Sequence, residues 1–330
     1  MSTIVGLGLA LPEHRLAVDE GRAIIAKHWP HLTGVAVEPV TRYLVRPIEE
    51  VFEARTIAER MTIYAREAPN LAKAAVTRAL DEAGVGPAEV DLVISVSCTG
   101  YMVPALDVRL ANELGFKPSV LRLPLTELGC SGGAMALATA HRHLEAQPQA
   151  VVLVVCVELC SVTFDPGDLS IDNLTASLVF GDGAAAAVLM TDGPGLEIRK
   201  AGSHLIPESE HLLGFQLTDS GFHPVLGRQL PRELEAGLAG VVSGFCDQEV
   251  DFHAVHAGGP RIFDAVERAL RVPPMGLQAS RRCFREVGNL SSASLLFVLA
   301  QLTERSGIGL ALAFGPGLAV ELLELRAARG

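Results

Sequence analysis

Two short motifs of this chain combine a reactive or polar side chain with small residues at the start of a predicted helix. Cys130 stands in Gly-Cys-Ser-Gly-Gly before the small-residue segment 135–144, and Asn289 stands in Gly-Asn-Leu-Ser-Ser before the segment 294–302. A helix N-terminus stabilises negative charge, so a cysteine placed there is favoured as a thiolate. The pattern therefore predicts that Cys130 is a nucleophile that forms covalent thioesters.

His256 is a third residue that could do chemistry, because it ends an apolar strand and is followed by Ala-Gly-Gly-Pro, a predicted turn into a helix. Polar groups at the carboxyl ends of strands lie where α/β sheets place their sites. Taken singly, each residue has a structural alternative: a buried cysteine, a hydrogen-bonded core histidine and an asparagine helix cap. Together, an imidazole and an amide can both donate hydrogen bonds to a thioester oxygen that becomes an enolate or an oxyanion.

The elements around these residues occur twice in the same order. The apolar strands predicted at 91–97 and 151–155 have counterparts at 251–256 and 308–312, about 160 positions later, which is also the spacing of Cys130 and Asn289. This order predicts two duplicated halves related by a pseudo-twofold axis, with one composite site. We place the boundary at the Gly-Pro-Gly run 193–195, which divides the chain into residues 1–193 with the cysteine and 194–330 with the histidine and asparagine.

Strands and helices alternate along the chain, which indicates an α/β protein whose sheet is covered on both faces. Residues 4–11 are predicted as a buried first strand, and residues 203–230 as an ordered but irregular connection near the site. Further buried strands are predicted at 151–157, 184–190 and 308–314, and helices at 56–84, 104–114, 131–146, 231–247, 260–270 and 291–304.

The composition argues against several functional classes. The chain has 330 residues, of which 49% are hydrophobic and 20% charged, so a large core is possible. A net charge of −11 argues against binding to nucleic acid or to an anionic membrane surface. No run reaches the roughly 18–20 apolar residues of a membrane span. The six cysteines form no Cys-x-x-Cys pair, so we expect no metal site, and reduced thiols in a cytoplasm.

Over nearly its whole length the chain resembles the type III polyketide synthases, the chalcone synthase-like branch of the thiolase superfamily. The resemblance implies an α/β, thiolase-like fold in which two duplicated αβαβα halves form a five-layered core. It depends on motifs in the family's order: Gly-Cys-Ser-Gly-Gly at 129–133, Val-Thr-Phe at 162–164, Phe-Gly-Asp-Gly-Ala-Ala-Ala at 180–186, His-Ala-Gly-Gly-Pro at 256–260, Gly-Asn-Leu-Ser-Ser at 288–292 and Phe-Gly-Pro-Gly at 314–317.

The resemblance also implies a role for each candidate. Cys130 would accept an acyl starter as a thioester, and His256 would pair with it and keep it ionised. His256 and Asn289 would hold malonyl-CoA, drive its decarboxylation and stabilise the enolate that attacks the thioester. Such Claisen condensations would be iterative and end in a cyclised pyrone or phenol. Phe180 and Phe222 would be gatekeepers between a coenzyme A tunnel and the cavity, and no metal or other cofactor would be needed.

Residues of the cavity and the carrier site are assigned from the same family pattern. The basic cluster that binds coenzyme A phosphates in plant enzymes does not align cleanly, so an acyl carrier protein remains an alternative to acyl-CoA. Arg261, Arg42 and Lys27 are the candidates for coenzyme A contacts. The family also implies a homodimer, with Val103 reaching across the interface. The substrate cavity is expected to include Cys98, Thr99, Val103, Cys160, Thr163, Gly214 and Ser291.

Two other functions stay open. A single-round ketosynthase of the β-ketoacyl carrier-protein synthase III type also uses Cys, His and Asn, although Thr163-Phe164 and Phe222 favour the polyketide synthase. A catalytically silent acyl-binding scaffold with the same fold is the alternative from a different class. The intact set of Cys130, His256 and Asn289 argues against it.

Overall fold

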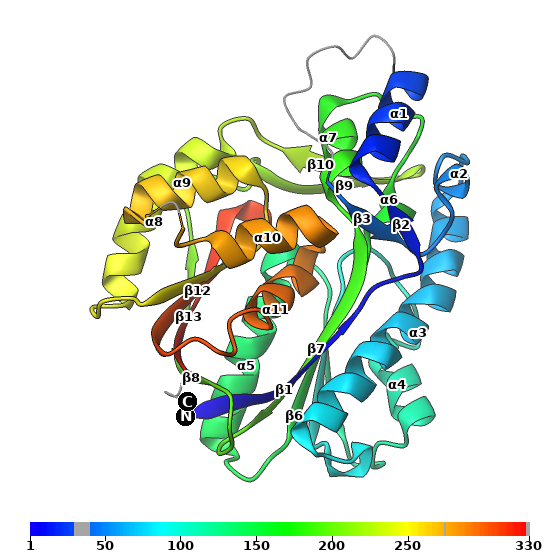
Figure 1. Ribbon diagram of the computed structural model, residues 1–330. Coiled ribbons are helices and arrows are strands. Elements are labelled where there is room, and N and C mark those ends of the chain that lie inside the picture. Colours follow the sequence, from blue (N-terminus) through cyan, green and yellow to red (C-terminus); the bar gives the residue numbers. More distant parts are fainter. Residues whose placement is uncertain (30–39, 274, 328–330) are drawn as a thin grey trace.

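A nine-stranded sheet runs through the computed structural model, which describes residues 1–29, 40–273 and 275–327 (Figure 1). The two halves of this sheet meet where the first strand pairs antiparallel with the strand that begins at Leu196. Across the sheet the order is β11 (Phe252–Val255), β12 (Gly307–Gly315), β13 (Ala319–Ala327), β8 (Leu196–Leu205), β1 (Ser2–Ala10), β7 (Asp182–Met190), β6 (Val152–Leu159), β4 (Leu92–Val96) and β5 (Leu121–Leu125).

The strand order contains the predicted duplication. In the first half β4 is parallel to β6, β6 is antiparallel to β7, and β7 is antiparallel to β1. In the second half β11, β12, β13 and β8 follow one another with the same sequence of directions. Two segments with one topology therefore lie side by side, and the α/β fold of two like halves is confirmed.

Helices form the other layers of the molecule (Figure 1). The middle layer contains α5 (Gly132–Ala146) and α11 (Ser294–Leu299), and α5 contacts strands of both halves. The outer layer of the first half contains α3 (Ile57–Ala83) and α4 (Leu106–Leu114). The outer layer of the second half contains α8 (Leu230–Phe245) and α9 (Pro260–Leu270), which pack against each other. Next to them lies α10 (Gln278–Val287).

The long helix α3 shows how the sequence specifies one of these layers. Thr56 and Glu59 form a capping box at its start, and Gly84 ends it in the left-handed conformation. A buried stripe of alanines faces the sheet, and an ideal Cβ on Gly8 of β1 would lie only 2.0 Å from the carbonyl oxygen of Ala75. Small residues on both elements thus let the helix lie close against the strand.

Smaller elements complete the described structure. Two antiparallel sheets of two strands each lie outside the main sheet: β2 (His14–Leu16) with β3 (Arg42–Leu44), and the hairpin of β9 (Leu213–Thr218) with β10 (Gly221–Leu226). The short helices are α1 (Val18–His28), α2 (Ile48–Val51), α6 (Cys160–Thr163), α7 (Ile171–Val179), η1 (Pro87–Glu89), η2 (Gly129–Ser131), η3 (Ser291–Ala293) and η4 (Pro316–Leu318).

Most predicted elements are confirmed to within about two residues, and two expectations are wrong. Residues 203–230 are not irregular, because β8 continues to Leu205 and β9 and β10 form a hairpin around a Thr-Asp-Ser-Gly turn. The helix expected at 291–304 is a 3-10 turn followed by α11, which ends at Leu299. No helix in the described ranges is long and apolar enough to cross a bilayer.

Candidate active site

The two helix starts that the sequence singled out lie against each other at the centre of the molecule. Cys130 belongs to η2, just before α5, and Asn289 precedes η3 and α11. An ideal Cβ on Gly133 would lie 2.3 Å from the carbonyl oxygen of Ser292, so only glycine allows the two segments to come this close. The duplication therefore brings Cys130 and Asn289 to one place.

The Ser291 hydroxyl contacts two thiols near Asn289, those of Cys130 and Cys98. Its oxygen accepts a hydrogen bond from the Cys130 thiol at 3.6 Å and lies 3.3 Å from the sulfur of Cys98. The backbone of Ser291 has a φ of 47°, a left-handed conformation that non-glycine residues seldom adopt. Such strain at a buried serine between two cysteines marks a functional site.

The amide of Asn289 is oriented by its own loop. Its Oδ1 accepts hydrogen bonds from the backbone nitrogen of Ser291 at 2.9 Å and from the hydroxyl of Ser294 at 3.3 Å. The backbone on both sides is held by a bridge between Phe180 and Asn289. Because Oδ1 is occupied, the NH2 group is the part of the side chain left to donate to a substrate oxygen.

His256 approaches from the second half of the sheet. It follows β11, its backbone nitrogen donates to the carbonyl of Leu312 in β12 at 2.8 Å, and β12 ends against η2. The side chain is 2% exposed, and its Nδ1 has no hydrogen-bond partner among the described residues. A buried imidazole with an unpaired nitrogen is available to a ligand.

Burial decides the protonation of both groups. It raises the pKa of the Cys130 thiol to about 12, with contacts from the Ser291 and Asn289 side chains partly opposing the rise. Burial likewise lowers the pKa of His256 to about 4. Within the described part of the chain no hydrogen bond joins Cys130 to His256. Desolvation thus opposes the effect of the helix N-terminus and favours the neutral forms of both groups, and the ionised pair stays a prediction.

A buried carboxylate, Glu158, accepts hydrogen bonds from the segments on which the thiol of Cys98 and the 3-10 turn η3 lie. Glu158, at the end of β6, accepts hydrogen bonds from the backbone nitrogen of Cys98 at 3.1 Å, from the Thr99 hydroxyl at 2.8 Å and from the Ser292 hydroxyl. The Cys98 thiol also donates to it at 3.5 Å. Burial raises the pKa of Glu158. One side chain thus ties the 97–99 segment to η3.

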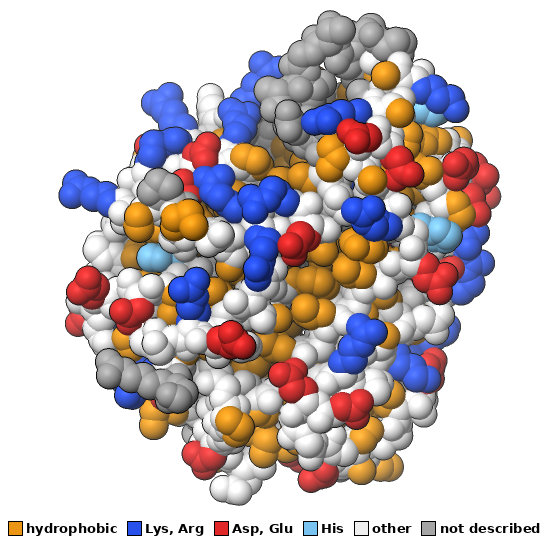
Figure 2. Space-filling model, viewed as in Figure 1, with side chains coloured by type: hydrophobic (Ala, Val, Ile, Leu, Met, Phe, Trp, Pro, Cys, Tyr) orange, Lys and Arg blue, Asp and Glu red, His pale blue; other side chains and the backbone are white. Residues whose placement is uncertain are grey.

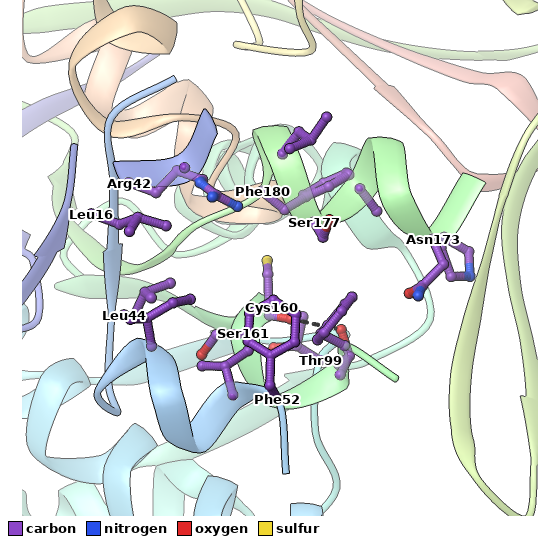
Figure 3. Close-up of a pocket in the computed structure, with 18 of the residues that line it drawn as sticks. Leu16, Arg42, Leu44, Phe52, Thr99, Cys160, Ser161, Asn173, Ser177 and Phe180 are labelled. Carbon is purple, nitrogen blue, oxygen red and sulfur yellow. Dashed lines mark hydrogen bonds between the residues drawn. The ribbon is translucent and has the colours of Figure 1, made fainter. Parts of the chain in front are cut away.

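A cavity opens beside these groups, with about 830 Å³ of empty space including its mouth (Figure 3). In Figure 3 the sulfur of Cys160 points into its middle, between Phe180 and Arg42 on one side and Phe52 and Thr99 on the other. The lining contains most of the predicted cavity and gate residues: Thr99, Cys160, Thr163, Phe180, Phe222 and Ser291. Cys98 touches the lining residue Ser291.

Several predicted residues lie elsewhere. Gly214 does not line the cavity, because its neighbour Phe215 occupies that wall and packs edge-on against Phe222 at 6.3 Å. Val103 is 77% exposed and lies outside the cavity of its own chain. Lys27 is exposed on α1. Arg42 is buried and lines the cavity, which does not fit a clamp for phosphates at the surface. Burial lowers its pKa to about 10, and the charge of Asp182 opposes this.

Arg261 is the second residue of α9, four residues beyond Ala257, and lies at a surface hollow with other arginines. Arg268 in this hollow is paired with Glu235 at 2.9 Å. Arg228, Arg232 and Arg261 have no ion-pair partner among the residues that the structure describes. Figure 2 shows Lys and Arg side chains gathered on this α8–α10 side of an otherwise acidic protein. No three His, Cys, Asp or Glu side chains in the described ranges are grouped to hold a metal ion.

Some residues of the site were missed from the sequence. Glu158 is a lone carboxylate in the apolar run 152–159, and such a charge needs buried partners, which was a usable signal. Phe215 aligns across the hairpin with Pro224 on the strand that carries Phe222, which required knowing that residues 213–226 form a hairpin. Other missed lining residues come from distant segments and carry no local signal, among them Leu16, Trp29, Leu44, Ile48 and Phe52.

Comparison with known proteins places this geometry in context. Residues 40–194 match the family model of chalcone and stilbene synthases, N-terminal domain, and residues 197–329 match the C-terminal domain of the same family. The chain is 35% identical to a 1,3,6,8-tetrahydroxynaphthalene synthase of Streptomyces coelicolor, over 98% of this chain and 91% of the relative. It is 30% identical to a phloroglucinol synthase of Pseudomonas fluorescens, over 98% of each chain.

Solved structures agree with these sequence matches. The crystal structure of the tetrahydroxynaphthalene synthase from Streptomyces coelicolor A3(2), a bacterial type III polyketide synthase, superposes with a TM-score of 0.93 at 33% identity, covering 99% of this chain and 100% of that one. CsyB in complex with CoA-SH superposes with a TM-score of 0.91 at 25% identity, covering 99% and 100%.

Proposed function

The chain belongs to the chalcone and stilbene synthase family and is a type III polyketide synthase, and on this premise we propose that Cys130 carries the growing acyl chain while His256 and Asn289 act on malonyl-CoA. The observation that supports this assignment best is the contact of the two helix starts, which places the Cys130 thiol and the Asn289 loop on either side of Ser291.

Loading begins from a neutral thiol and a neutral imidazole. As the sulfur of Cys130 attacks the carbonyl carbon of the starter thioester, His256 takes the thiol proton, and the oxygen becomes an oxyanion. The NH2 group of Asn289 donates to that oxygen. The tetrahedral intermediate then expels the thiolate of coenzyme A, which takes the proton back from His256 and leaves the acyl group on Cys130.

Extension uses malonyl-CoA as a masked carbanion. Loss of CO2 moves the electron pair of the broken C–C bond onto the malonyl thioester, whose oxygen becomes an enolate held by Asn289 and His256. The enolate carbon attacks the thioester on Cys130, a new C–C bond forms, and the sulfur leaves as thiolate. The product is a β-ketoacyl-CoA two carbons longer. Decarboxylation supplies the carbanion, so we propose that no cofactor is required besides the coenzyme A thioesters.

Coenzyme A, rather than a carrier protein, is the acyl carrier in this proposal. Arg228, Arg232 and Arg261 are exposed, unpaired within the described ranges, and line one surface hollow, with Arg261 in the first turn of α9, the helix that follows His256. Guanidinium groups bind phosphates through paired N–H donors. A lower kcat/KM for acyl-CoA in Arg261→Ala, with an unchanged rate on a short pantetheine thioester that lacks the nucleotide, is the expected result.

We propose a homodimer located in the cytoplasm, where its six free thiols stay reduced. Two features support a second copy. The edge strand β5 carries exposed leucines, with Leu121 57% exposed, and an open edge of this kind pairs readily with another strand. Tyr101 and Val103 are also exposed, at 66% and 77%. Sedimentation that finds a fully active monomer would refute the dimer.

Incubation with malonyl-CoA and a panel of acyl-CoA starters, read by mass spectrometry, tests the synthase itself. We expect cyclised products, pyrones or phenols of the kind made by the named relatives, from wild type and none from Cys130→Ala. A single condensation with a linear product would instead assign the chain to the single-round ketosynthases. Product formation by Cys130→Ala at the wild-type rate would remove Cys130 from the mechanism.

A further inference from the structure

A histidine and an aspartate outside the catalytic set join the hairpin of β9 and β10 to the segment before α7. The Nδ1 atom of His223 lies 2.8 Å from Oδ2 of Asp168, and its Nε2 atom lies 2.9 Å from the hydroxyls of Ser220 and Thr218. Because a carboxylate accepts hydrogen bonds, Nδ1 carries a proton and is the donor. The two side chains are only 23% and 15% exposed. The contact is thus a partly buried, charge-assisted hydrogen bond, which we call the His223–Asp168 clamp.

The clamp acts on the strand that carries Phe222. Successive side chains of a strand point to opposite faces, so the side chains of Phe222 and His223 do the same. Phe222 and Pro224, two residues apart in β10, both line the cavity, whereas His223 contacts Asp168. The clamp therefore holds β10 on the face opposite the cavity, at the residue next to the predicted gatekeeper.

The other end of the clamp is fixed to the helix that carries the second gatekeeper. Oδ1 of Asp168 accepts a hydrogen bond from the backbone nitrogen of Ser170 at 2.8 Å, and Ser170 is the N-cap of α7. The C-cap of the same helix is Phe180, which lines the cavity. Asp172, in the first turn of α7, accepts from the backbone nitrogen of Leu226 at 2.9 Å (Figure 1). Two carboxylates, one before the start of α7 and one in its first turn, thus hold β10 beside the helix that ends at Phe180.

The hairpin of β9 and β10 packs less completely than the main sheet. Among the described strands, β9 and β10 pair only with each other. Phe215 and Leu217 of β9 are 40% and 65% exposed, so part of the apolar surface of the hairpin is not covered by the described residues. At the tip, Nε of Arg60 donates to the Ser220 carbonyl at 3.2 Å. A segment packed in this way depends on individual polar contacts for its position.

Resting on the proposed function, we propose that His223 and Asp168 are positioning residues that hold Phe222 in the cavity wall and so keep water out during condensation. Neither residue is part of the lining, so both act through Phe222. An enolate that meets water takes a proton from it and leaves as acetyl-CoA, with hydroxide as the other product, instead of attacking the thioester on Cys130. The clamp thus sets the fraction of decarboxylations that end in a new C–C bond.

The ratio of acetyl-CoA released to C–C bonds formed tests this role. Both are measured as initial rates by mass spectrometry, with malonyl-CoA and the starter that wild type uses best. Both come from the same folded molecules, so a variant that is merely less stable keeps the ratio. We expect the ratio to rise about tenfold in His223→Ala and in Asp168→Ala. Gln216→Ala is the matched control and should keep the wild-type ratio, because Gln216 is exposed and pairs with His223 across the hairpin.

A conservative variant and a double variant show whether the two residues act as a pair. Asp168→Asn keeps an acceptor for the Ser170 nitrogen and has an NH2 group that can donate to Nδ1, so most of the wild-type ratio should return. The double variant His223→Ala/Asp168→Ala should have the ratio of either single variant rather than the product of the two changes. Ser220→Ala keeps the clamp and should match wild type. A rise in Ser220→Ala equal to that in Asp168→Ala would overturn the clamp and assign the effect to a proton relay through the serine.

Amide hydrogen exchange gives a readout that needs no turnover and separates this inference from the proposed function. The amides of residues 213–226 should exchange about tenfold faster in His223→Ala and at the wild-type rate in Gln216→Ala. Faster exchange with an unchanged ratio would overturn the positioning role and leave the synthase intact. Unchanged exchange would show that the hairpin does not depend on the clamp. A wild-type protein that forms no condensation product would overturn the proposed function, and this role of the clamp with it.

Discussion

Replacing Asn289 with aspartate separates the chemical role of its amide from its structural role. The Oδ1 atom already accepts hydrogen bonds from the Ser291 backbone and the Ser294 hydroxyl, and an aspartate oxygen can accept both. The variant therefore keeps the loop and the position of Ser291. It loses only the NH2 group, which donates to the thioester oxygen in the proposed mechanism, and it adds a negative charge in its place.

The magnitude follows from the loss of one donor to a developing oxyanion. Such a loss costs about 10²–10³ in rate, or about 3–4 kcal/mol in the barrier. We expect Asn289→Asp to decarboxylate malonyl-CoA at least 100-fold more slowly than wild type. Asn289→Ala should lose the same rate and also stability, because the buried Ser291 nitrogen is left unpaired at a cost of about 1–3 kcal/mol.

Two assays isolate the steps. Acetyl-CoA released from malonyl-CoA measures decarboxylation, and intact-protein mass spectrometry with a starter acyl-CoA measures acylation of Cys130. In Asn289→Asp, decarboxylation should fall far more than acylation, and the unfolding midpoint should stay near that of wild type. Decarboxylation within fivefold of wild type would refute the assignment of Asn289 as the donor. An equal fall in both steps would mean that the substitution disturbs the thiol instead.

Three further substitutions test other parts of the site. Burial lowers the pKa of His256 to about 4 in the folded protein, against 6.5 in the unfolded chain. As the pH falls below 6.5, this histidine is therefore protonated in the unfolded chain before it is protonated in the folded protein. The free energy of unfolding should thus drop by about 3 kcal/mol by pH 4. In urea unfolding, the drop in the free energy of unfolding toward pH 4 should be smaller by that amount in His256→Gln than in wild type. Equal drops in the two proteins would contradict a lowered pKa of His256. Gly133→Ala puts a methyl group 2.3 Å from the Ser292 carbonyl, so turnover should fall about 100-fold, whereas Gly240→Ala, which meets open space in α8, should stay active. In Glu158→Gln an NH2 group replaces one of the two carboxylate oxygens that accept hydrogen bonds from Cys98 and Ser292. The free energy of unfolding should drop by about 1–3 kcal/mol. An unchanged value would show that the carboxylate does not hold the 97–99 segment against η3.

The fold and the closeness of Cys130 and Asn289 were readable from the sequence because the elements repeat. Strands with the same spacing in both halves carry the same pairing directions in the sheet, and the helix starts at Cys130 and Asn289 are equivalent in that topology. Convergence of these two residues needs no knowledge of packing. It follows from topology alone.

The features of the site that could not be predicted from the sequence depend on packing between segments far apart in the chain. Ser291 contacts both Cys98 and Cys130 because its backbone adopts a strained φ of 47°, which no propensity signals. Arg42 resembled a surface cation, and the charge of the buried Asp182 accounts for its place inside. Burial also opposes the expected thiolate at Cys130, since it raises the pKa of the thiol, and the cost of desolvation depends on the surrounding packing and not on the helix start.

The place of β1 in the sheet has a consequence for how the protein is made. This strand is synthesised well before its two neighbours in the sheet, β7 and β8, which belong to residues 182–205. At roughly 5–20 residues per second, a ribosome needs on the order of 10–35 s to produce the segment between Ala10 and Asp182. During that interval an apolar strand has neither edge paired, so the nascent chain depends on shielding, by a chaperone or the ribosome surface, until the middle of the molecule emerges.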